Sequence, residues 1–579
     1  MHRLFETTTE RVVTELDGAW EFCTDRDDEG RAAGYAESFP TEDATDLQVP
    51  CVWNAVPEFY EYEGPAWYRR TFTLREATNV RLTFMAVCHD TTVYLDGERL
   101  GEHYGGYTPF DFHLADLAAG EHELVLRVDN THDEETIPKP HVDWYHYGGI
   151  TRPVVLEAVG DAIVDDVHLN YAVADDGSVT VEPDVEIHNF GAGGTYDLSV
   201  AIDGEVHAET SLSLEADDER VSVGTNFTLD DPDRWSPDDP TLYDYTVRLE
   251  RAAAGAADAD AVAETDADAD DYRDRVGFRE IEVTPTDILV NGEPVDIRGV
   301  NRHEDHPEWG HAVPQRLMQR DVDIIRDAGC NGVRTSHYPN HPAFLDYCDR
   351  EGLLVVEEIP YWHFEDEDFE KDVVLERGKQ MLAEMVTRDY DHPAIVAWSL
   401  HNECETQQQE VAEATEELAA VVRDIDTSRP VTYATNKHYL GDEENSTAPI
   451  DFLCINGYWG WYSEEREWDE FLDSIREEFP EMPIVVSEFG AGAVAGERNF
   501  DRRKWSERRQ SDIVENAITT FDEKEYVAGY YIWQFCDVNA DEGMLTGRPK
   551  LQNNKGIVDA YRQPKEAFWT VRDLHGVED

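Results

Sequence analysis

The chain has 579 residues, of which 41% are hydrophobic and 11% aromatic, so it is long enough for two to four domains and apolar enough to fill their cores. Its 126 acidic residues outnumber 48 basic ones and give a formal net charge of -78. That charge argues against nucleic acid as a partner, and the aromatic content argues against a disordered acidic chain.

The basic residues are poor in lysine: only 9 of the 48 are lysine and the other 39 are arginine. This acid-rich, lysine-poor balance resembles that of proteins from halophiles, which fold in concentrated salt. At 1 M salt the Debye length is about 3 Å, so repulsion between surface carboxylates is screened. We therefore expect a halophilic protein whose acidic excess lies on folded surfaces.

The eight cysteines include no CxxC pair, and several lie in apolar strand-like segments, as free buried thiols do. The N-terminal stretch MHRLFETTTERVV has neither the apolar run nor the twin arginine of an export signal. No run of apolar residues approaches the length of about 18 that a membrane-spanning helix needs. The expected location is the cytoplasm, without membrane contact.

The first half of the chain alternates short strands with turns. In residues 1–160, segments such as VRLTFMAV, TTVYLDGERL and HELVLRVDN predict a β-sandwich. Residues 161–283 continue with DVEIHNF, YDLSVAID and YDYTVRLE, which predict a second, smaller sandwich. An acidic low-complexity block, AAAGAADADAVAETDADADD, begins at Ala252, and we expect it to form a solvated hairpin loop.

In residues 284–579 the pattern changes to apolar strands that alternate with helices such as LMQRDVDIIRDAG. The predicted strands are DIRGVNRH, NGVRTSHY, LLVVEEIP, IVAWSLHNE, PVTYATN, DFLCINGY, PIVVSEFG and VAGYYIWQF. Eight such strands with intervening helices predict a (β/α)8 TIM barrel, whose active site lies at the C-terminal ends of the strands.

The predicted strand ends carry many polar or aromatic side chains: His303, Glu304, His337, Glu357, Glu358, Asn402, Glu403, Asn456, Tyr458, Glu488 and Trp533. Glu403 ends the fourth strand and Glu488 the seventh, so they can face each other across the barrel mouth. Retaining glycoside hydrolysis uses two carboxyl groups about 5 Å apart, one as nucleophile and the other as acid and then base. A position on the barrel rim explains either glutamate alone, but not the joint pattern.

Five motifs extend this pattern: GVNRHEDHP (299–307), GVRTSHYPNHP (332–342), AWSLHNE (397–403), VVSEFG (485–490) and GYYIWQFCD (529–537). In these motifs and their order, most of the chain resembles glycoside hydrolase family 2, the β-galactosidase and β-glucuronidase group. The resemblance implies a sugar-binding jelly-roll β-sandwich, an immunoglobulin-like β-sandwich and a catalytic TIM barrel.

The resemblance also implies roles for individual residues. Glu403 resembles the acid/base of the family, Glu488 its nucleophile, and Asn402 the residue that hydrogen-bonds the sugar 2-hydroxyl. Further candidates for substrate binding are His303, His337, Asn456, Tyr458, Tyr462, Trp533 and, from VDWYHYGGITRP in the first sandwich, Asp143. For these further candidates the alternative is a structural histidine, a packed aromatic ring or a solvated loop aspartate.

Two motifs bear on the sugar. Asn553, Asn554 and Lys555 match the Asn-x-Lys element with which β-glucuronidases of the family hold the C6 carboxylate. An ammonium and an amide suit that role because charge-assisted hydrogen bonds are about twice as strong as neutral ones. CINGYWGWY (454–462) matches the NxYxGWY spacing of the same enzymes. The resemblance therefore implies a retaining exo-acting β-glucuronidase that removes terminal β-D-glucuronic acid.

Some features depart from the glucuronidase pattern. Pro549 stands where those enzymes carry an arginine, so Arg548 or Lys550 would have to replace it. His401 and Cys404 flank the acid/base, where the family usually keeps a small residue before the asparagine. The stretch TSHYPNHP is more similar to galactosidases. The alternatives are a β-galactosidase of the same family and a non-catalytic carbohydrate-binding protein.

A magnesium site is the remaining possibility for the third strand end. Glu357, Glu358 and His363 lie close in sequence and are similar to magnesium ligands of some galactosidases, but the barrel already accounts for the carboxylates. We expect no metal and no cofactor. The expected partner is a small-molecule glycoside or an oligosaccharide, and the sequence does not distinguish a monomer from a homo-oligomer.

The acidic composition generates a prediction about salt. We expect the melting temperature to fall when the ionic strength is lowered from about 1 M, because unscreened repulsion between carboxylates destabilises the compact state. Thermal unfolding before and after dialysis to low salt measures this effect. An unchanged melting temperature would contradict the halophilic interpretation.

Overall fold

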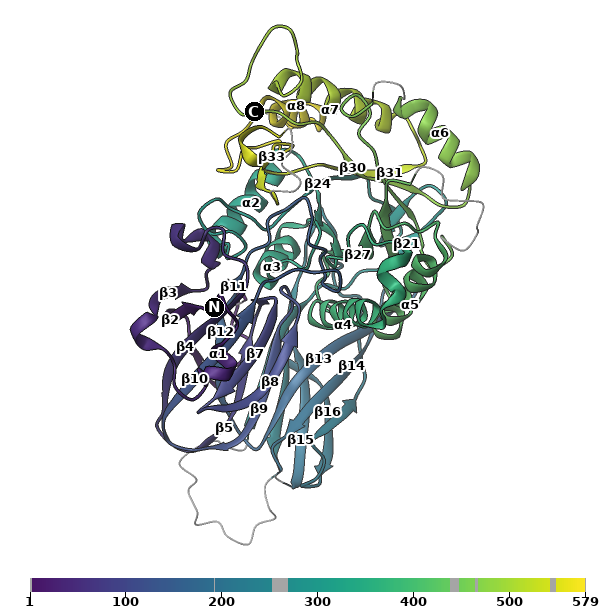
Figure 1. Cartoon of the computed structure of the whole chain (residues 1–579). Coiled ribbons are helices and arrows are strands. Elements are labelled where there is room, and N and C mark those ends of the chain that lie inside the picture. Colours follow the sequence, from purple (N-terminus) through teal and green to yellow (C-terminus); the bar gives the residue numbers. More distant parts are fainter. Residues whose placement is uncertain are drawn as a thin grey trace.

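The computed structural model describes residues 3–191, 193–252, 269–437, 447–463, 467–541 and 548–577. These residues form two β-sandwiches and a closed eight-stranded barrel (Figure 1). Among the described residues, no helix has the length and apolar character needed to span a bilayer. All eight cysteines are free thiols, and seven of them are buried.

The first sandwich consists of two antiparallel sheets. One contains, in spatial order, β1 (Val12–Glu15), β12 (Val154–Val159), β5 (Thr78–Phe84) and β9 (Phe110–Leu117). The other contains β3 (Thr45–Val49), β2 (Gly18–Thr24), β4 (Pro65–Leu74), β10 (Gly120–Asp129), β7 (Asp90–Leu95) and β8 (Glu98–Tyr104). A two-stranded pair, β6 (Val87–Cys88) with β11 (Gly149–Ile150), and the short helix α1 (Gly30–Ala33) complete the domain.

Alternation in β5 shows why this sandwich forms. Val80, Leu82 and Phe84 point to one side and are buried, and the residues between them are partly exposed. A period of two places one face of a strand in the core and the other toward solvent. The buried face of β5 shares one core with Leu124 and Leu126 of β10 in the other sheet.

The second sandwich also has two antiparallel sheets. One contains β13 (Ala162–Val173), β14 (Val179–Asn189), β17 (Arg220–Gly224) and β18 (Phe227–Leu229); the other contains β16 (Glu205–Leu214), β15 (Gly194–Ile202), β19 (Tyr243–Arg251) and β20 (Ala269–Val276). Of the acidic block, residues 253–268 lie outside the described residues. The expectation of a solvated loop is wrong for Asp270 and Asp271, which are buried in β20.

These two aspartates are buried because the N-terminal segment supplies their partners. Arg11 Nε donates to Asp270 Oδ1 at 2.8 Å, and Thr8 Oγ1 donates to Asp271 Oδ1 at 2.6 Å. Arg11 also lies 3.4 Å from Glu157 of the first sandwich. Buried charges require such pairing, so this segment links the two sandwiches.

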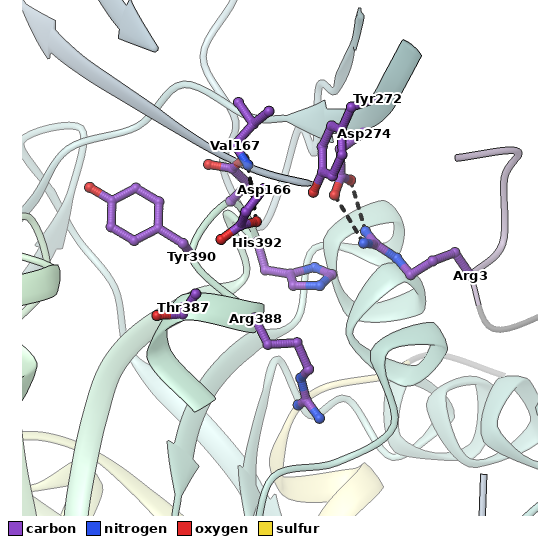
Figure 2. Close-up of a pocket in the computed structure, with 10 residues that line it drawn as sticks. Arg3, Asp166, Val167, Tyr272, Asp274, Thr387, Arg388, Tyr390 and His392 are labelled. Carbon is purple, nitrogen blue, oxygen red and sulfur yellow. Dashed lines mark hydrogen bonds and ion pairs between the residues drawn. The ribbon is translucent and has the colours of Figure 1, made fainter. Parts of the chain in front are cut away.

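A second contact of the same segment reaches the barrel. Arg3 pairs with Asp274 of β20 and with Asp346 of α3 (Pro342–Glu351), each at 2.8 Å. Figure 2 shows the Arg3–Asp274 pair beside His392 and Arg388 at this junction. The N-terminal segment thus connects all three domains.

The barrel contains the eight predicted strands, which are confirmed in sequence order. They are β24 (Ile297–Asn301), β25 (Gly332–Thr335), β26 (Leu354–Glu358), β27 (Ile395–Asn402), β28 (Val431–Thr435), β29 (Leu453–Asn456), β30 (Ile484–Phe489) and β31 (Val527–Ile532). Parallel pairing of β24 with β31 closes the ring. The predicted fold class of jelly-roll sandwich, immunoglobulin-like sandwich and TIM barrel is confirmed.

Helices accompany the strands. They are α2 (Gln315–Asp327), α3, α4 (Asp372–Arg388), α5 (Gln409–Ile425), α6 (Trp468–Glu478), α7 (Glu507–Asp522) and α8 (Glu566–Leu574). A small sheet of β21 (Ile281–Val283), β22 (Ile288–Val290) and β23 (Glu293–Pro294) precedes the barrel, and β32 (Val538–Asn539) pairs with β33 (Gln552–Asn553) after it. Every residue of β27 is buried, as expected for a parallel strand covered on both faces.

A loop of the first sandwich covers part of the barrel mouth. Val142 and Trp144 of this loop pack with Tyr338 after β25 and Trp362 after β26. The first sandwich therefore contributes side chains next to the C-terminal ends of the barrel strands, where a TIM barrel has its active site.

Candidate active site

Two glutamates meet at the C-terminal ends of the barrel strands. Glu403 directly follows β27, and Glu488 lies in β30. Asn456 at the end of β29 joins them: it is in register with Glu488, and its Nδ2 donates to Glu403 Oε1 at 2.9 Å. The same Nδ2 also donates to Asn402 Oδ1 at 3.0 Å. Both glutamates are buried, so this part of the barrel mouth, here called the pocket, keeps them largely away from water.

Glu488 is held by two donors. Arg334 Nη1 donates to its Oε1 at 3.1 Å, and Tyr458 OH donates to its Oε2 at 2.5 Å. Tyr458, a candidate for substrate binding, is therefore placed directly against Glu488. Both donors stabilise a charged carboxylate and fix its orientation.

Sequence analysis did not identify Arg334 as a site residue. Its guanidinium also binds Glu358 at 2.8 Å, and its Nη2 donates to Asn402 Oδ1 at 2.9 Å. The sequence feature that could have indicated its role is a charged residue inside a predicted barrel strand. That strand, Gly332–Thr335, is fully buried. A buried arginine needs carboxylate partners, and the neighbouring strand ends supply them.

Glu403 has a second partner that the sequence did not reveal. His363 Nε2 lies 2.7 Å from Glu403 Oε2. Both residues have a positive φ, 57° for His363 and 55° for Glu403, in the left-handed region that non-glycine residues seldom adopt. The chain after β26 and the chain after β27 thus turn toward each other and place the imidazole on the carboxylate.

The two glutamates differ in acidity. Burial and the charge of Glu403 raise the pKa of Glu488 to about 8. Burial acts on Glu403 as well, but hydrogen bonds from His363 and Asn456 outweigh it and lower the pKa of Glu403. Carboxyl groups that interact this closely titrate as a pair, so the pair keeps one proton up to about pH 8.

Aromatic rings and histidines form one wall of the pocket. His337 stacks on Trp533 with ring centroids 5.1 Å apart, and its Nδ1 lies 2.7 Å from Glu358 Oε1. His303 meets Trp533 edge-on at 5.4 Å. Its buried Nε2 has no hydrogen-bond partner among the described residues. Burial lowers the pKa of both histidines, so they are neutral hydrogen-bonding groups at neutral pH.

Another group of predicted residues gathers beside the pocket. Asp143 accepts from Arg548 Nη2 at 2.8 Å and from Asn553 Nδ2 at 2.9 Å. Lys555 Nζ donates to Asn553 Oδ1 at 3.1 Å and lies 5.8 Å from the ring centroids of both Tyr458 and Tyr462. Asp143 therefore positions Arg548 and Asn553.

Arg548, not Lys550, reaches this group. Lys550 is exposed, whereas the Arg548 guanidinium forms a two-point ion pair with Asp143. The pair crosses from the barrel to the first sandwich, so the loop that contains Asp143 completes the site. Tyr462 is 63% exposed and lies at the rim.

His401 does not enter the pocket. Its Nε2 lies 3.0 Å from Thr415 Oγ1 of α5, and its ring stacks on Tyr433 of β28 at 4.5 Å. Alternation along β27 explains this, since Asn402 points to the pocket and its neighbour to the helix layer. The unusual histidine beside the predicted acid/base is a packing residue.

The three residues considered as magnesium ligands do not converge. Glu358 binds Arg334, and His363 binds Glu403. Glu357 accepts instead from the Asn340 backbone at 3.2 Å and lies 3.7 Å from Arg388. Glu357 and Glu358 lie against arginines, and the three side chains point to different partners. They therefore do not form the cluster of oxygen ligands that a divalent cation needs.

Comparison with known families agrees with this architecture. The model of the glycosyl hydrolases family 2 TIM barrel domain matches residues 281–577. The chain belongs to glycoside hydrolase family 2. The family 2 sugar-binding domain matches residues 13–159, and a further family 2 domain matches residues 162–279. The chain is thus a glycoside hydrolase with three family 2 domains.

Individual relatives cover nearly the whole chain. The β-glucuronidase of Canis lupus familiaris is 29% identical over 98% of this chain and 91% of its own. A family 2 β-galacturonidase from Eisenbergiella tayi, solved with galacturonate, is 33% identical with a TM-score of 0.89 over 99% of both chains. The β-glucuronidase of Ruminococcus gnavus is 25% identical with a TM-score of 0.86 over 99% of both chains.

The paired glutamates generate a pH prediction. We expect kcat/KM for an aryl glycoside to fall as the pH rises through about 8, because the pair then loses its shared proton. His363→Asn removes a bond that stabilises the charged form of Glu403, so the fall should move to higher pH. Profiles of kcat/KM against pH for the parent and the variant measure both effects. Superimposable profiles would contradict this account of His363.

Proposed function

We propose that this glycoside hydrolase is a retaining exo-acting β-uronidase that removes terminal β-D-glucuronic acid. The supporting observation is the Lys555 ammonium, which is buried and has no carboxylate partner among the described residues. A buried, unpaired charge is costly, and in a chain of net charge -78 an unpaired cation at the pocket is unexpected. A C6 carboxylate of the substrate would neutralise it.

The proposed mechanism assigns a different role to each glutamate. Glu488, oriented by Arg334 and Tyr458, attacks the anomeric carbon while Glu403 protonates the departing oxygen. Glu403 then takes a proton from water, which releases the sugar from Glu488 with retention. Asn402, whose Oδ1 already accepts from Arg334 and Asn456, donates through its Nδ2 to the oxygen of the sugar 2-hydroxyl.

The acid role requires the proton on Glu403, whereas the pKa of Glu403 is lowered and that of Glu488 is raised. Entry of a glycosidic oxygen beside Glu403 therefore has to displace the His363 contact. Loss of that contact raises the affinity of Glu403 for the proton, and Glu488 can then ionise against Arg334.

A β-galacturonide is the second candidate substrate. The supporting observation is that the solved galacturonidase is 33% identical, against 29% for the canine glucuronidase. Galacturonic acid differs from glucuronic acid only at C4 and has the same C6 carboxylate, so Lys555 serves either sugar. A β-galactoside, by contrast, leaves the ammonium unpaired.

Lys555→Ala tests the sugar assignment. We expect kcat/KM for an aryl glucuronide to fall about 10- to 100-fold, because hydrogen bonds to charged groups contribute about 1.5–3 kcal/mol, while the rate on a neutral aryl galactoside changes little. Exposed Lys550 provides the matched control, and Lys550→Ala should alter neither substrate. Equal losses on both glycosides would show that Lys555 does not contact a carboxylate.

Glu488→Gln tests the nucleophile. Its amide retains the shape of the side chain but cannot form the covalent intermediate, so turnover of an activated aryl glucuronide should fall by several orders of magnitude. A thermal melt controls for folding. Parental activity in a folded variant would contradict the assignment and favour another nucleophile.

A substrate panel run across salt concentrations addresses the remaining expectations. Comparison of kcat/KM for the aryl glucuronide, galacturonide and galactoside separates the candidate sugars. Higher activity on the galactoside would contradict a uronidase. Halophilic character and cytoplasmic location stay predictions from composition and from the N-terminal sequence.

A further inference from the structure

One segment of this acidic chain is basic. Residues 498–509, RNFDRRKWSERR, contain six arginine or lysine residues and only two acidic ones, whereas the whole chain has 126 acidic and 48 basic residues. The segment lies between β30, which carries Glu488, and the first turn of α7. Figure 1 shows α7 and α8 together at the end of the molecule opposite the sandwiches.

Part of this segment lines a surface cavity of about 360 Å³, here called the Arg498 groove. Its lining consists of Arg498, Asn499, Phe500, Arg508, Glu566 and Trp569. Phe500 is 93% exposed and Trp569 49% exposed. Two large aromatic rings on one exposed cavity are unusual for a free surface, because such rings are normally buried in cores or interfaces.

The arginines of the groove keep donors available for a ligand. Arg498 pairs with Glu507 at 3.1 Å and Arg508 with Glu566 at 3.8 Å, while the two arginine side chains are 63% and 44% exposed. The Glu507 carboxylate is buried, with its side chain 2% exposed, but both guanidinium groups reach solvent and each has five N–H donors, more than one carboxylate can use. A ligand carboxylate can therefore bind the remaining donors of either arginine while the existing pair stays in place.

Lys504, from the same basic segment as the groove arginines, reaches the rim of the active site. Its Nζ lies 4.4 Å from the ring centroid of Trp461 and 5.8 Å from that of Tyr462. Lys555 Nζ also lies 5.8 Å from Tyr462, so the two ammonium groups flank the same exposed ring. Lys504 is the fourth residue after Phe500, so their Cα atoms are at most about 14 Å apart.

We propose that the Arg498 groove binds the leaving-group portion of an acidic oligosaccharide whose terminal uronide occupies the active site. This inference rests on the proposed uronidase function. Apolar faces of a sugar ring pack on Phe500 and Trp569, and its carboxylate pairs with Arg498 and Arg508. The volume of the Arg498 groove, about 360 Å³, lies at the lower end of the range of about 300–1,000 Å³ for small-molecule sites.

The two arginines of the groove favour an acidic ligand over a neutral glycan. The net charge of -78 repels an anionic oligosaccharide at long range, and concentrated salt removes the repulsion but leaves contact pairs in place. The acidic surface of a second copy of this chain is the competing occupant. The concave shape, and the extension of the same basic segment to Lys504 at the rim, favour the oligosaccharide.

The test compares three substrates with the same terminal β-D-glucuronic acid. They are an aryl glucuronide, a trisaccharide with a second carboxylate in its leaving group, and the same trisaccharide with that carboxylate reduced to an alcohol. Arg498→Gln combined with Arg508→Gln removes the cations, and Phe500→Ala with Trp569→Ala removes the rings. Arg503→Gln is the matched control, since Arg503 is also 63% exposed and pairs with Glu497 at 2.8 Å outside the groove.

We expect the double glutamine variant to lower kcat/KM for the acidic trisaccharide about tenfold more than for the aryl glucuronide. The reduced trisaccharide should lose less, the alanine pair should weaken both trisaccharides, and Arg503→Gln should alter no ratio. Unchanged ratios in the groove variants would overturn the proposal. Absence of uronide turnover in the parent would instead contradict the proposed function.

Binding measurements decide the question without turnover. Calorimetric titration of Glu488→Gln with the acidic trisaccharide should give a weaker Kd, by about tenfold, when both groove arginines are replaced. Equal affinity would overturn the proposal even if the protein is not a uronidase. Sedimentation tests whether a second copy of the chain occupies the groove instead. If the parent is a dimer and the double glutamine variant is a monomer, the groove is an interface between copies.

Discussion

The buried guanidinium of Arg334 is the constraint on which the active site depends. It binds Glu488 and Glu358, and it also donates to Asn402. Burial of Glu358 is offset by Arg334 and His337, so its pKa falls to about 2 and it stays charged. An arginine and two carboxylates can be buried only if every partner is in place. Correct closure of the barrel therefore positions Glu488 and Asn402 together.

Charge is distributed unevenly between the site and the rest of the molecule. The chain carries -78 overall, yet Lys555, Arg548 and Arg334 are concentrated at one mouth. Arg548 is held by Asp143 of the first sandwich, so the cationic side of the pocket depends on contact between domains. A single barrel would supply the glutamates but not this arrangement, which also requires the jelly-roll domain.

Position along the strands allowed much of the site to be predicted. Glu403, Asn402, Asn456 and Glu488 follow apolar runs of barrel length, and parallel strands bring their C-terminal ends to one mouth. His363 could not be predicted in the same way, because its contact with Glu403 depends on two left-handed residues in separate loops. The solvated loop expected around Asp270 was wrong because its partner, Arg11, lies far away in sequence.

The sequence by itself determined the domain order, the eight barrel strands and the pair of glutamates, since apolar periodicity and strand-end position are local properties of the chain. Only the tertiary structure decided how these groups are charged and held. Arg334 meets Glu488 across 154 residues and Arg548 meets Asp143 across 405. His401 shows the same division: its sequence position beside Asn402 suggests the pocket, but strand alternation turns it to Thr415, because neighbouring side chains of a strand point to opposite faces.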